Sequence, residues 1–275
     1  ASGTLYTVGG GSVRMVVTLT AFIAGSVLGA AHFPFWQKAP SLGPVSLIQT
    51  LGVPVALSLS LMVFAAIAWL TVLAERRRHG GIAEGGLRLS PSGERQRGQW
   101  MRGPWPLVAG ALGLAAVNVA TLWLAGRPWG VTSAFALWGS KALAAAGVPV
   151  ASWPYWATRQ NELNASVLSD VTSVMNFGIV AGALVAAGLA GRFAPTWRIP
   201  LRSLVAAVVG GLCLGYGARI AYGCNIGAYF SGIVSASLHG WVWGAAAFAG
   251  SVLGTRLRPL FGLSVEGRHH REVSS

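Results

Sequence analysis

Six long apolar runs dominate the pattern of hydrophobic and polar positions along this chain. They cover residues 13–31, 51–74, 105–125, 171–190, 203–218 and 240–255. A bilayer core of about 30 Å is crossed by about 20 mostly apolar helical residues. The first four runs have that length, and the last two are shorter but still apolar. We therefore predict an all-α polytopic membrane protein with about six transmembrane helices.

The charged residues gather between these runs. Only 10% of the residues are charged, yet the net charge is +13, from 20 Lys and Arg against 7 Asp and Glu. Most of the Arg residues lie in 75–103, 192–202 and 256–271, which the positive-inside rule places in the cytoplasm. Segment 75–103 is also rich in Gly, Ser and Glu, as in a solvated loop. We therefore expect membrane lipid, and no nucleic acid, as a partner.

The placement of these segments fixes the direction of each run. Residues 131–150 and 219–239 must then each begin and end on the outer side, and both stretches are too short to cross the membrane twice. We predict re-entrant segments or half helices there, because broken helix at membrane depth is tolerated only inside protein or beside a cavity. The aromatic clusters at 33–36 and 153–156 are predicted to lie at the outer membrane interface.

One hexapeptide occurs twice. The letters AGSVLG stand at 24–29 and again at 249–254, and the preceding segments align with a one-residue slip, so that Gly3 matches Gly227. A helix face of small residues would explain the hexapeptide alone. However, the match extends upstream and the two copies are expected to have opposite orientations, which is typical of inverted-repeat transporters.

The repeat also predicts how the chain is divided. The position that matches Cys224 falls just before Ala1, so we expect the first repeat to begin upstream of this sequence. We predict the end of a first repeat at 1–74, a basic cytoplasmic loop at 75–104, a second repeat at 105–256 and a basic cytoplasmic tail at 257–275.

The densest candidate motif is Gly223-Cys224-Asn225, inside the Gly-rich segment 215–232. Gly allows close backbone approach. A helix that begins near Asn225 would point free N–H groups and the positive end of its dipole at the space beside Cys224, which favours an anion. The predicted substrate-binding residues are Gly223, Cys224, Asn225, Ile226 and Gly227, with Gly3 and Thr4 from the first repeat.

Four further residues are candidates for a functional or a structural role. Arg219 is either a pathway cation or a partner of Asp170. Asp170 and Asn176 are polar residues in or beside an apolar run, which favours a function, although Asp170 equally suits the N-cap of the helix after it. Cys213 lies in an apolar stretch typical of a small core residue. The sequence has no metal-binding spacing of Cys and His and no complete phosphate-binding loop, so we expect no metal and no cofactor.

The run GYGARIAYGCNIGAYFSGIVSASLHGWVWG resembles the signature of the YeeE/YedE family of sulfur-transport membrane proteins. ASGTLYTVGGGS and DVTSVMNFGIVAGAL share that family's pattern. The resemblance implies uptake of thiosulfate or a related sulfur or selenium species across the bacterial inner membrane. It also implies a pathway lined by helix N-termini and cysteine thiols, with Cys224 as one thiol, and a small TusA-like sulfur carrier as a cytoplasmic partner.

We therefore expect a transporter of thiosulfate or a similar small anion, and not an enzyme. Uptake of a selenium compound by the same scaffold is one alternative. A membrane sulfurtransferase that holds a persulfide on Cys224 is another, and a purely structural membrane subunit is a third.

Overall fold

The computed structural model describes residues 1–41, 43–80, 105, 107–193, 195, 197 and 199–262. The predicted loop 75–104 and tail 257–275 therefore lie mostly outside the described residues. Within the described ranges, every regular element is helical, and extended pairing is limited to one isolated bridge between Ser46 and Ser237.

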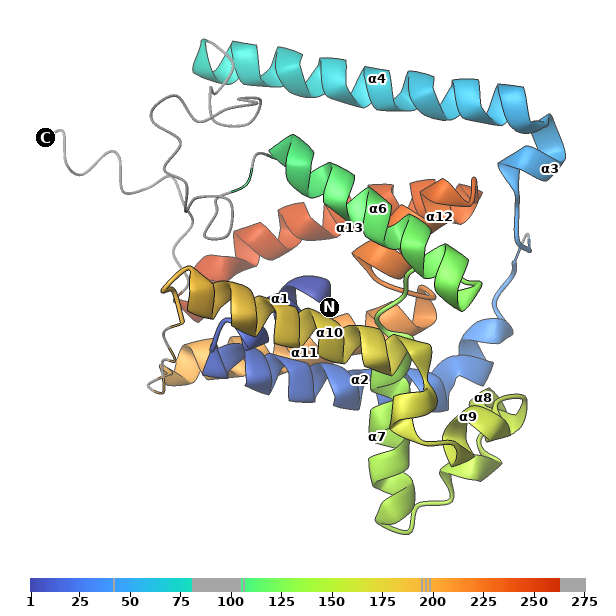
Figure 1. Ribbon diagram of the computed structural model, residues 1–275, viewed down its shortest axis with the longest axis vertical. Coiled ribbons are helices and arrows are strands. Elements are labelled where there is room, and N and C mark those ends of the chain that lie inside the picture. The colour runs from blue at the N-terminus through green and yellow to red at the C-terminus, as the bar shows by residue number, and fades with distance from the viewer. Residues whose placement is uncertain are drawn as a thin grey trace, which may run out of the picture.

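The helices follow the apolar runs (Figure 1). The longer ones are α1 (Ser2–Gly9), α2 (Val13–Gln37), α4 (Val53–His79), α6 (Leu107–Ala125), α7 (Ser133–Ala145), α10 (Val171–Leu189), α11 (Leu201–Ile220) and α13 (Leu238–Leu257). The short ones are α3 (Leu47–Leu51), α8 (Pro154–Ala157), α9 (Gln160–Asn164) and α12 (Ser231–Val234), with single 3-10 turns at Val150–Ser152, Val167–Ser169 and Arg258–Phe261 and a π-helix, η3, at Asn225–Phe230.

Among the described residues, five segments are long and apolar enough to cross a membrane. They are Val13–Gln37, Val53–Arg77, Leu107–Ala125, Val171–Leu189 and Leu201–Val234. The sixth predicted run forms α13, which has 20 residues but is made less apolar by His239, Trp241, Trp243 and several glycines. The chain is thus an all-α polytopic membrane protein, as predicted.

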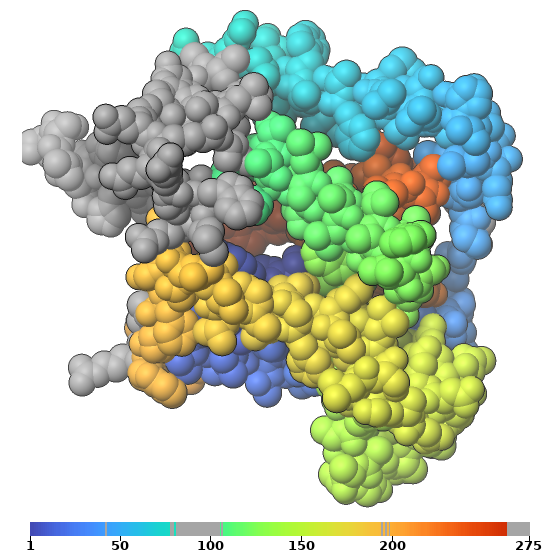
Figure 2. Space-filling model, viewed as in Figure 1, coloured from blue at the N-terminus to red at the C-terminus, as the bar shows by residue number. Residues whose placement is uncertain are grey.

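The long helices run roughly along one common direction (Figure 1). Helices α2 and α13, which carry the two copies of AGSVLG, run in opposite directions. In α4 and in α6, only 6% of the most apolar 18-residue stretch is buried inside the protein. In α2 the corresponding share is 44%. Figure 2 shows openings between α4 and the rest of the molecule. Helices α4 and α6 therefore have exposed apolar surfaces, whereas α2 belongs to the core.

The core is built on close contact between α2 and α11. A Cβ atom on Gly25 would collide with the carbonyl oxygen of Leu212, and one on Gly211 would lie 2.6 Å from the carbonyl oxygen of Thr18. Ser26 adds a hydrogen bond from its Oγ to the carbonyl oxygen of Gly215, at 3.3 Å. Small residues let the two backbones approach in this way.

The stretch 131–150 does not form a span. Its helix, α7, has 13 residues and lies across the direction of α2 and α10 (Figure 1). Phe135 packs edge-on against Phe22 in the middle of α2, with ring centroids 5.0 Å apart. The Nζ of Lys141 donates to the carbonyl oxygens of Leu163 and Ala165, both at 2.6 Å. This lysine therefore ties α7 to the segment that follows it.

The prediction for the aromatic cluster at 153–156 is wrong in part. Tyr155 is 8% exposed and Trp156 is 1% exposed, because the chain after α7 folds back and α8 packs onto α2. The Nε1 of Trp156 donates to Ser140 Oγ at 3.0 Å. By contrast, Phe35 in the other cluster is 71% exposed, as a membrane-facing residue would be.

Candidate anion-binding site

The end of α11 turns the chain back toward the core. Tyr222 has a left-handed backbone, with φ of 56°, which is uncommon for a residue other than Gly. The N–H of Gly223 then donates to the carbonyl oxygen of Ala218 at 2.9 Å. A Cβ atom at Gly223 would lie 2.6 Å from the backbone nitrogen of Ala228. Only glycine fits at this position without a shift of the neighbouring backbone.

Cys224 follows this turn and is buried, with 6% of its surface exposed. Its carbonyl oxygen accepts hydrogen bonds from the N–H groups of Ala228, at 2.8 Å, and Tyr229, at 3.3 Å. These bonds start η3 at Asn225, where the sequence predicts a helix to begin, although its π-helical form was not predicted. Single turns of π-helix occur often at functional sites.

The start of η3 leaves backbone donors without acceptors. Within the described part of the chain, no residue accepts a hydrogen bond from the N–H groups of Asn225, Ile226 or Gly227. Such groups are available to water or a ligand, and the helix dipole adds positive potential at the same end. This combination favours an anion beside Cys224.

A cavity of about 450 Å³ opens next to Cys224, between α11 and α13. Its lining residues are Ala1, Phe22, Cys213, Leu214, Gly217, Ala218, Gly223, Cys224, Asn225, Trp243, Ala247, Gly250 and Ser251. None of these side chains carries a charge. Gly250 and Ser251 belong to the second copy of AGSVLG, so in α13 this face lines the cavity, whereas in α2 it packs against α11.

Cys213 also lines this cavity, and its side chain is exposed. The expectation that it is a core residue is therefore wrong. Its face of α11 turns away from α2 and toward the cavity, which the apolar composition of the helix could not reveal. Both cysteines are free thiols.

The structure separates the seven predicted substrate-binding residues. Gly223, Cys224 and Asn225 line the cavity, while Ile226 packs against the apolar cluster around Leu5 and Phe22. Gly227, Gly3 and Thr4 do not line it. Gly3 and Thr4 lie in α1, which packs against α10 and α2. From the stretch predicted to be the end of the first repeat, Ala1 and Phe22 line the cavity.

Asp170 and Asn176 have structural contacts away from the cavity. The Oδ2 of Asp170 accepts from the backbone N–H of Ser173 at 2.8 Å and from its Oγ at 2.6 Å, which caps α10. Asn176 is fully buried, and its Nδ2 donates to the carbonyl oxygen of Val131 at 2.9 Å. That bond holds the irregular backbone before α7.

Arg219 does not pair with Asp170. It is 8% exposed, and its Nη1 donates to the hydroxyl of Tyr155 at 2.5 Å. The structure thus places this cation at the end of α11, against the segment around α8, and outside the lining of the Cys224 cavity.

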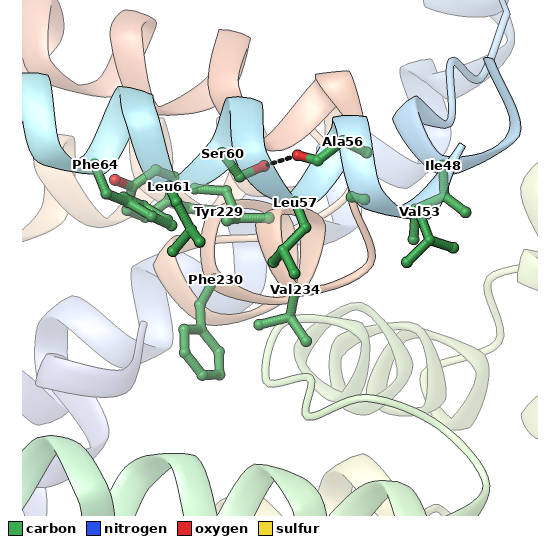
Figure 3. A pocket seen from close by; sticks show the side chains of 12 residues that line it. Ile48, Val53, Ala56, Leu57, Ser60, Leu61, Phe64, Tyr229, Phe230 and Val234 are labelled. Carbon is green, nitrogen blue, oxygen red and sulfur yellow. Dashed lines mark hydrogen bonds between the residues drawn. The ribbon is translucent and has the colours of Figure 1, made fainter. Parts of the chain in front are cut away.

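A second cavity, of about 410 Å³, lies between α4 and the segment of η3 and α12 (Figure 3). Its wall is almost wholly apolar, with Leu57, Phe64 and Phe230 among its residues. The hydroxyl of Ser60 donates to the carbonyl oxygen of Ala56 on its own helix, at 2.9 Å. This cavity therefore offers no site for an anion.

A buried cysteine at a helix break, beside an uncharged cavity between apolar helices, defines a multi-pass membrane protein with an internal cavity. Comparison with known families makes this more specific. The chain belongs to the family described as sulphur transport, whose sequence profile matches residues 1–253.

Curated relatives agree with this family. The chain is 31% identical over 172 residues to a protein named "Probable transporter YedE" from Escherichia coli (strain K12), and 34% identical over 172 residues to the protein of the same name from Salmonella typhimurium (strain LT2). Each match covers 61% of this chain, and 42% and 40% of the two relatives. The chain thus matches about two fifths of each relative's length. No solved structure matches it.

Proposed function

We propose that this chain forms part of a pathway that takes up thiosulfate, or a related small inorganic sulfur anion, across the bacterial inner membrane. The observation that carries the proposal is the position of Cys224. Cys224 lines the cavity together with Asn225, whose unused N–H group begins η3. A thiol can donate a weak hydrogen bond to a sulfur anion, and the N–H group of Asn225 can bind one of its oxygens.

An uncharged site of this kind suits transport. One helix terminus stabilises a bound anion by about 0.3–2 kcal/mol. The free energy needed to remove the anion from water is far larger. Several helix ends must therefore converge on the anion. The opposed copies of AGSVLG in α2 and α13 support a pathway built from two inverted halves. We propose that the remaining donors come from the part of the transporter that corresponds to the unmatched length of its relatives.

The direction of uptake follows from the charges. The Arg-rich segments are assigned to the cytoplasm, and Cys224 lies beyond the opposite end of α11. An anion that passes Cys224 would move toward the Arg-rich side, where a TusA-like carrier would receive it.

Growth on thiosulfate tests this proposal. A sulfur auxotroph that lacks its own thiosulfate uptake would carry the gene in its full natural context, either unchanged or with Cys224→Ser or Cys224→Ala. We expect slower growth on thiosulfate with both variants, unchanged growth on cysteine, and unchanged protein in the membrane. Growth equal to the parent would reject a role for the thiol.

The same strains separate the alternatives. Selenite that competes with thiosulfate for uptake would indicate a selenium substrate on the same scaffold. A sulfurtransferase would transfer one sulfur atom from thiosulfate to the Cys224 thiol and release sulfite. Mass spectrometry of the purified protein would then show the mass of one added sulfur atom on Cys224.

A further inference from the structure

The cavity beside Cys224 has one wall on α13. Its lining residues on this helix share one face, because they are spaced i, i+4, i+7 and i+8. They are Trp243, Ala247, Gly250 and Ser251. The last three have small side chains and leave their space to the cavity. The bulky indole of Trp243 therefore narrows this wall at one level, in the second turn of α13.

Phe22 is the other aromatic residue described in the lining, and its ring belongs to the core. The side chain is 1% exposed and packs edge-on against Phe135, with ring centroids 5.0 Å apart. Trp243, by contrast, is only partly buried. Of the two rings in the described lining, the indole of Trp243 is therefore the one that borders open space.

Contacts with η3 fix the ring of Trp243. It stacks on the ring of Tyr229, with centroids 5.8 Å apart and an interplanar angle of 26°. The next residue, Gly244, comes so close that a Cβ atom there would lie 2.6 Å from Cε2 of Tyr229. The backbone N–H of Tyr229 in turn donates to the carbonyl oxygen of Cys224 at 3.3 Å. The indole is therefore held in position relative to the residue that carries the thiol.

We propose that Trp243 sets the size limit for ligands that reach the Cys224 thiol. Cys224 is 6% exposed, so a ligand must enter the cavity to touch it. A fixed ring resists a bulky ligand, because overpacking is unfavourable. Small inorganic anions pass, whereas sulfur compounds that carry an aryl group are excluded. The assignment of sulfur anions as the ligands rests on the proposed function, but the size limit itself does not.

Two thiol reagents with the same reactive group and different bulk test this inference. Methyl methanethiosulfonate and benzyl methanethiosulfonate each form a disulfide with a thiol, which loses its proton, and each releases methanesulfinate. The purified chain in detergent would carry Cys213→Ser, so that Cys224 is its one thiol. Mass spectrometry would measure the rate at which each reagent modifies Cys224. The ratio of the two rates cancels any change in the reactivity of the thiol itself.

We expect the benzyl reagent to be the slower one in this parent. Trp243→Ala should raise the benzyl-to-methyl rate ratio about tenfold or more, because the overpacking is relieved. Trp243→Phe, which keeps a ring to stack on Tyr229, should raise the ratio by less. Trp241→Ala is the matched control and should leave the ratio unchanged. Trp241 lies two residues away on the same helix, is also partly buried, and lines a separate cavity beside α4.

An unchanged ratio in Trp243→Ala would overturn the inference, even if both rates rose. Loosened packing of η3 would admit both reagents alike, so it would not change the ratio. An equal rise of the ratio in Trp241→Ala would overturn the inference as well. If Trp243→Ala does not fold, Trp243→Phe decides, and an unchanged ratio in that variant rejects the size limit.

These results are independent of the thiol hypothesis, since the assay contains no thiosulfate. A raised ratio in Trp243→Ala, together with normal thiosulfate growth of Cys224→Ser, would keep the size limit and reject the role of the thiol in uptake. An unchanged ratio, together with slow growth of Cys224→Ser, would keep the thiol and reject the size limit.

Discussion

The Cβ atom of Arg219 lies 2.7 Å from the position that a Cβ atom on Gly29 would occupy. The matching glycine of the second hexapeptide copy, Gly254 in α13, has no atom within 4 Å of that position. The two glycines that end the same hexapeptide therefore have opposite environments. Gly29 lies at a tight contact between α2 and α11, whereas Gly254 is open.

This difference predicts unequal effects of the same change. Gly29→Ala should lower the free energy of unfolding by about 1–3 kcal/mol, because the added methyl group forces α2 and α11 apart. Gly254→Ala should leave it unchanged or raise it by up to about 1 kcal/mol through helix propensity. Thermal unfolding of the purified chain in detergent would measure both. Equal losses at the two positions would contradict the packing described here.

The turn before Cys224 allows a second matched comparison. Gly223→Ala would place a Cβ atom 2.6 Å from the nitrogen of Ala228, while Gly227→Ala meets no atom within 4 Å. We expect Gly223→Ala to displace the start of η3 and to reduce thiosulfate uptake about tenfold or more, as for about 1–3 kcal/mol of strain.

Gly227→Ala is the control, because its added methyl group points into open space. It should retain most of the uptake. Radiolabelled thiosulfate uptake in cells, corrected for the amount of protein in the membrane, distinguishes the two variants. Full uptake by Gly223→Ala would mean that the geometry at Cys224 is not required.

The sequence predicted the features that depend on local residue chemistry. The helix start at Asn225 follows from the Gly-Cys-Asn break, and the cap at Asp170 was one of two interpretations of an acidic residue before an apolar run. The spans followed from the length of the apolar runs. In each case the signal lies within a few turns of the residue concerned.

The features that depend on distant segments could not be predicted. Tyr155 and Trp156 have the composition of an interfacial cluster, but their burial requires the chain after α7 to fold back onto α2. The exposure of Cys213 depends on which face of α11 contacts α2. The pairing of Arg219 with Tyr155, 64 residues away in sequence, likewise has no local signal.

The contacts of Asp170 predict a role in stability. Asp170→Ala should lower the free energy of unfolding by about 0.5–2 kcal/mol, because the N-terminal donors of α10 lose their acceptor. Asp170→Asn should retain most of this stability, since asparagine is an equally good N-cap. Thermal unfolding of both variants would measure the difference. A pathway carboxylate would behave differently, and Asp170→Asn would then abolish thiosulfate uptake while the protein stayed fully stable.

The two cysteines predict different rates of thiol modification within one cavity. Cys213 is exposed and Cys224 is 6% exposed, yet both line the same space. A water-soluble maleimide should therefore modify Cys213 faster than Cys224, measured by mass spectrometry in the Cys224→Ser and Cys213→Ser variants.

An adduct on Cys213 also occupies the cavity beside Cys224. It should block thiosulfate uptake in otherwise unchanged protein, whereas Cys213→Ser, which adds no bulk, should retain uptake and resist the reagent. Uptake that survives complete modification of Cys213 would show that this cavity is not part of the pathway.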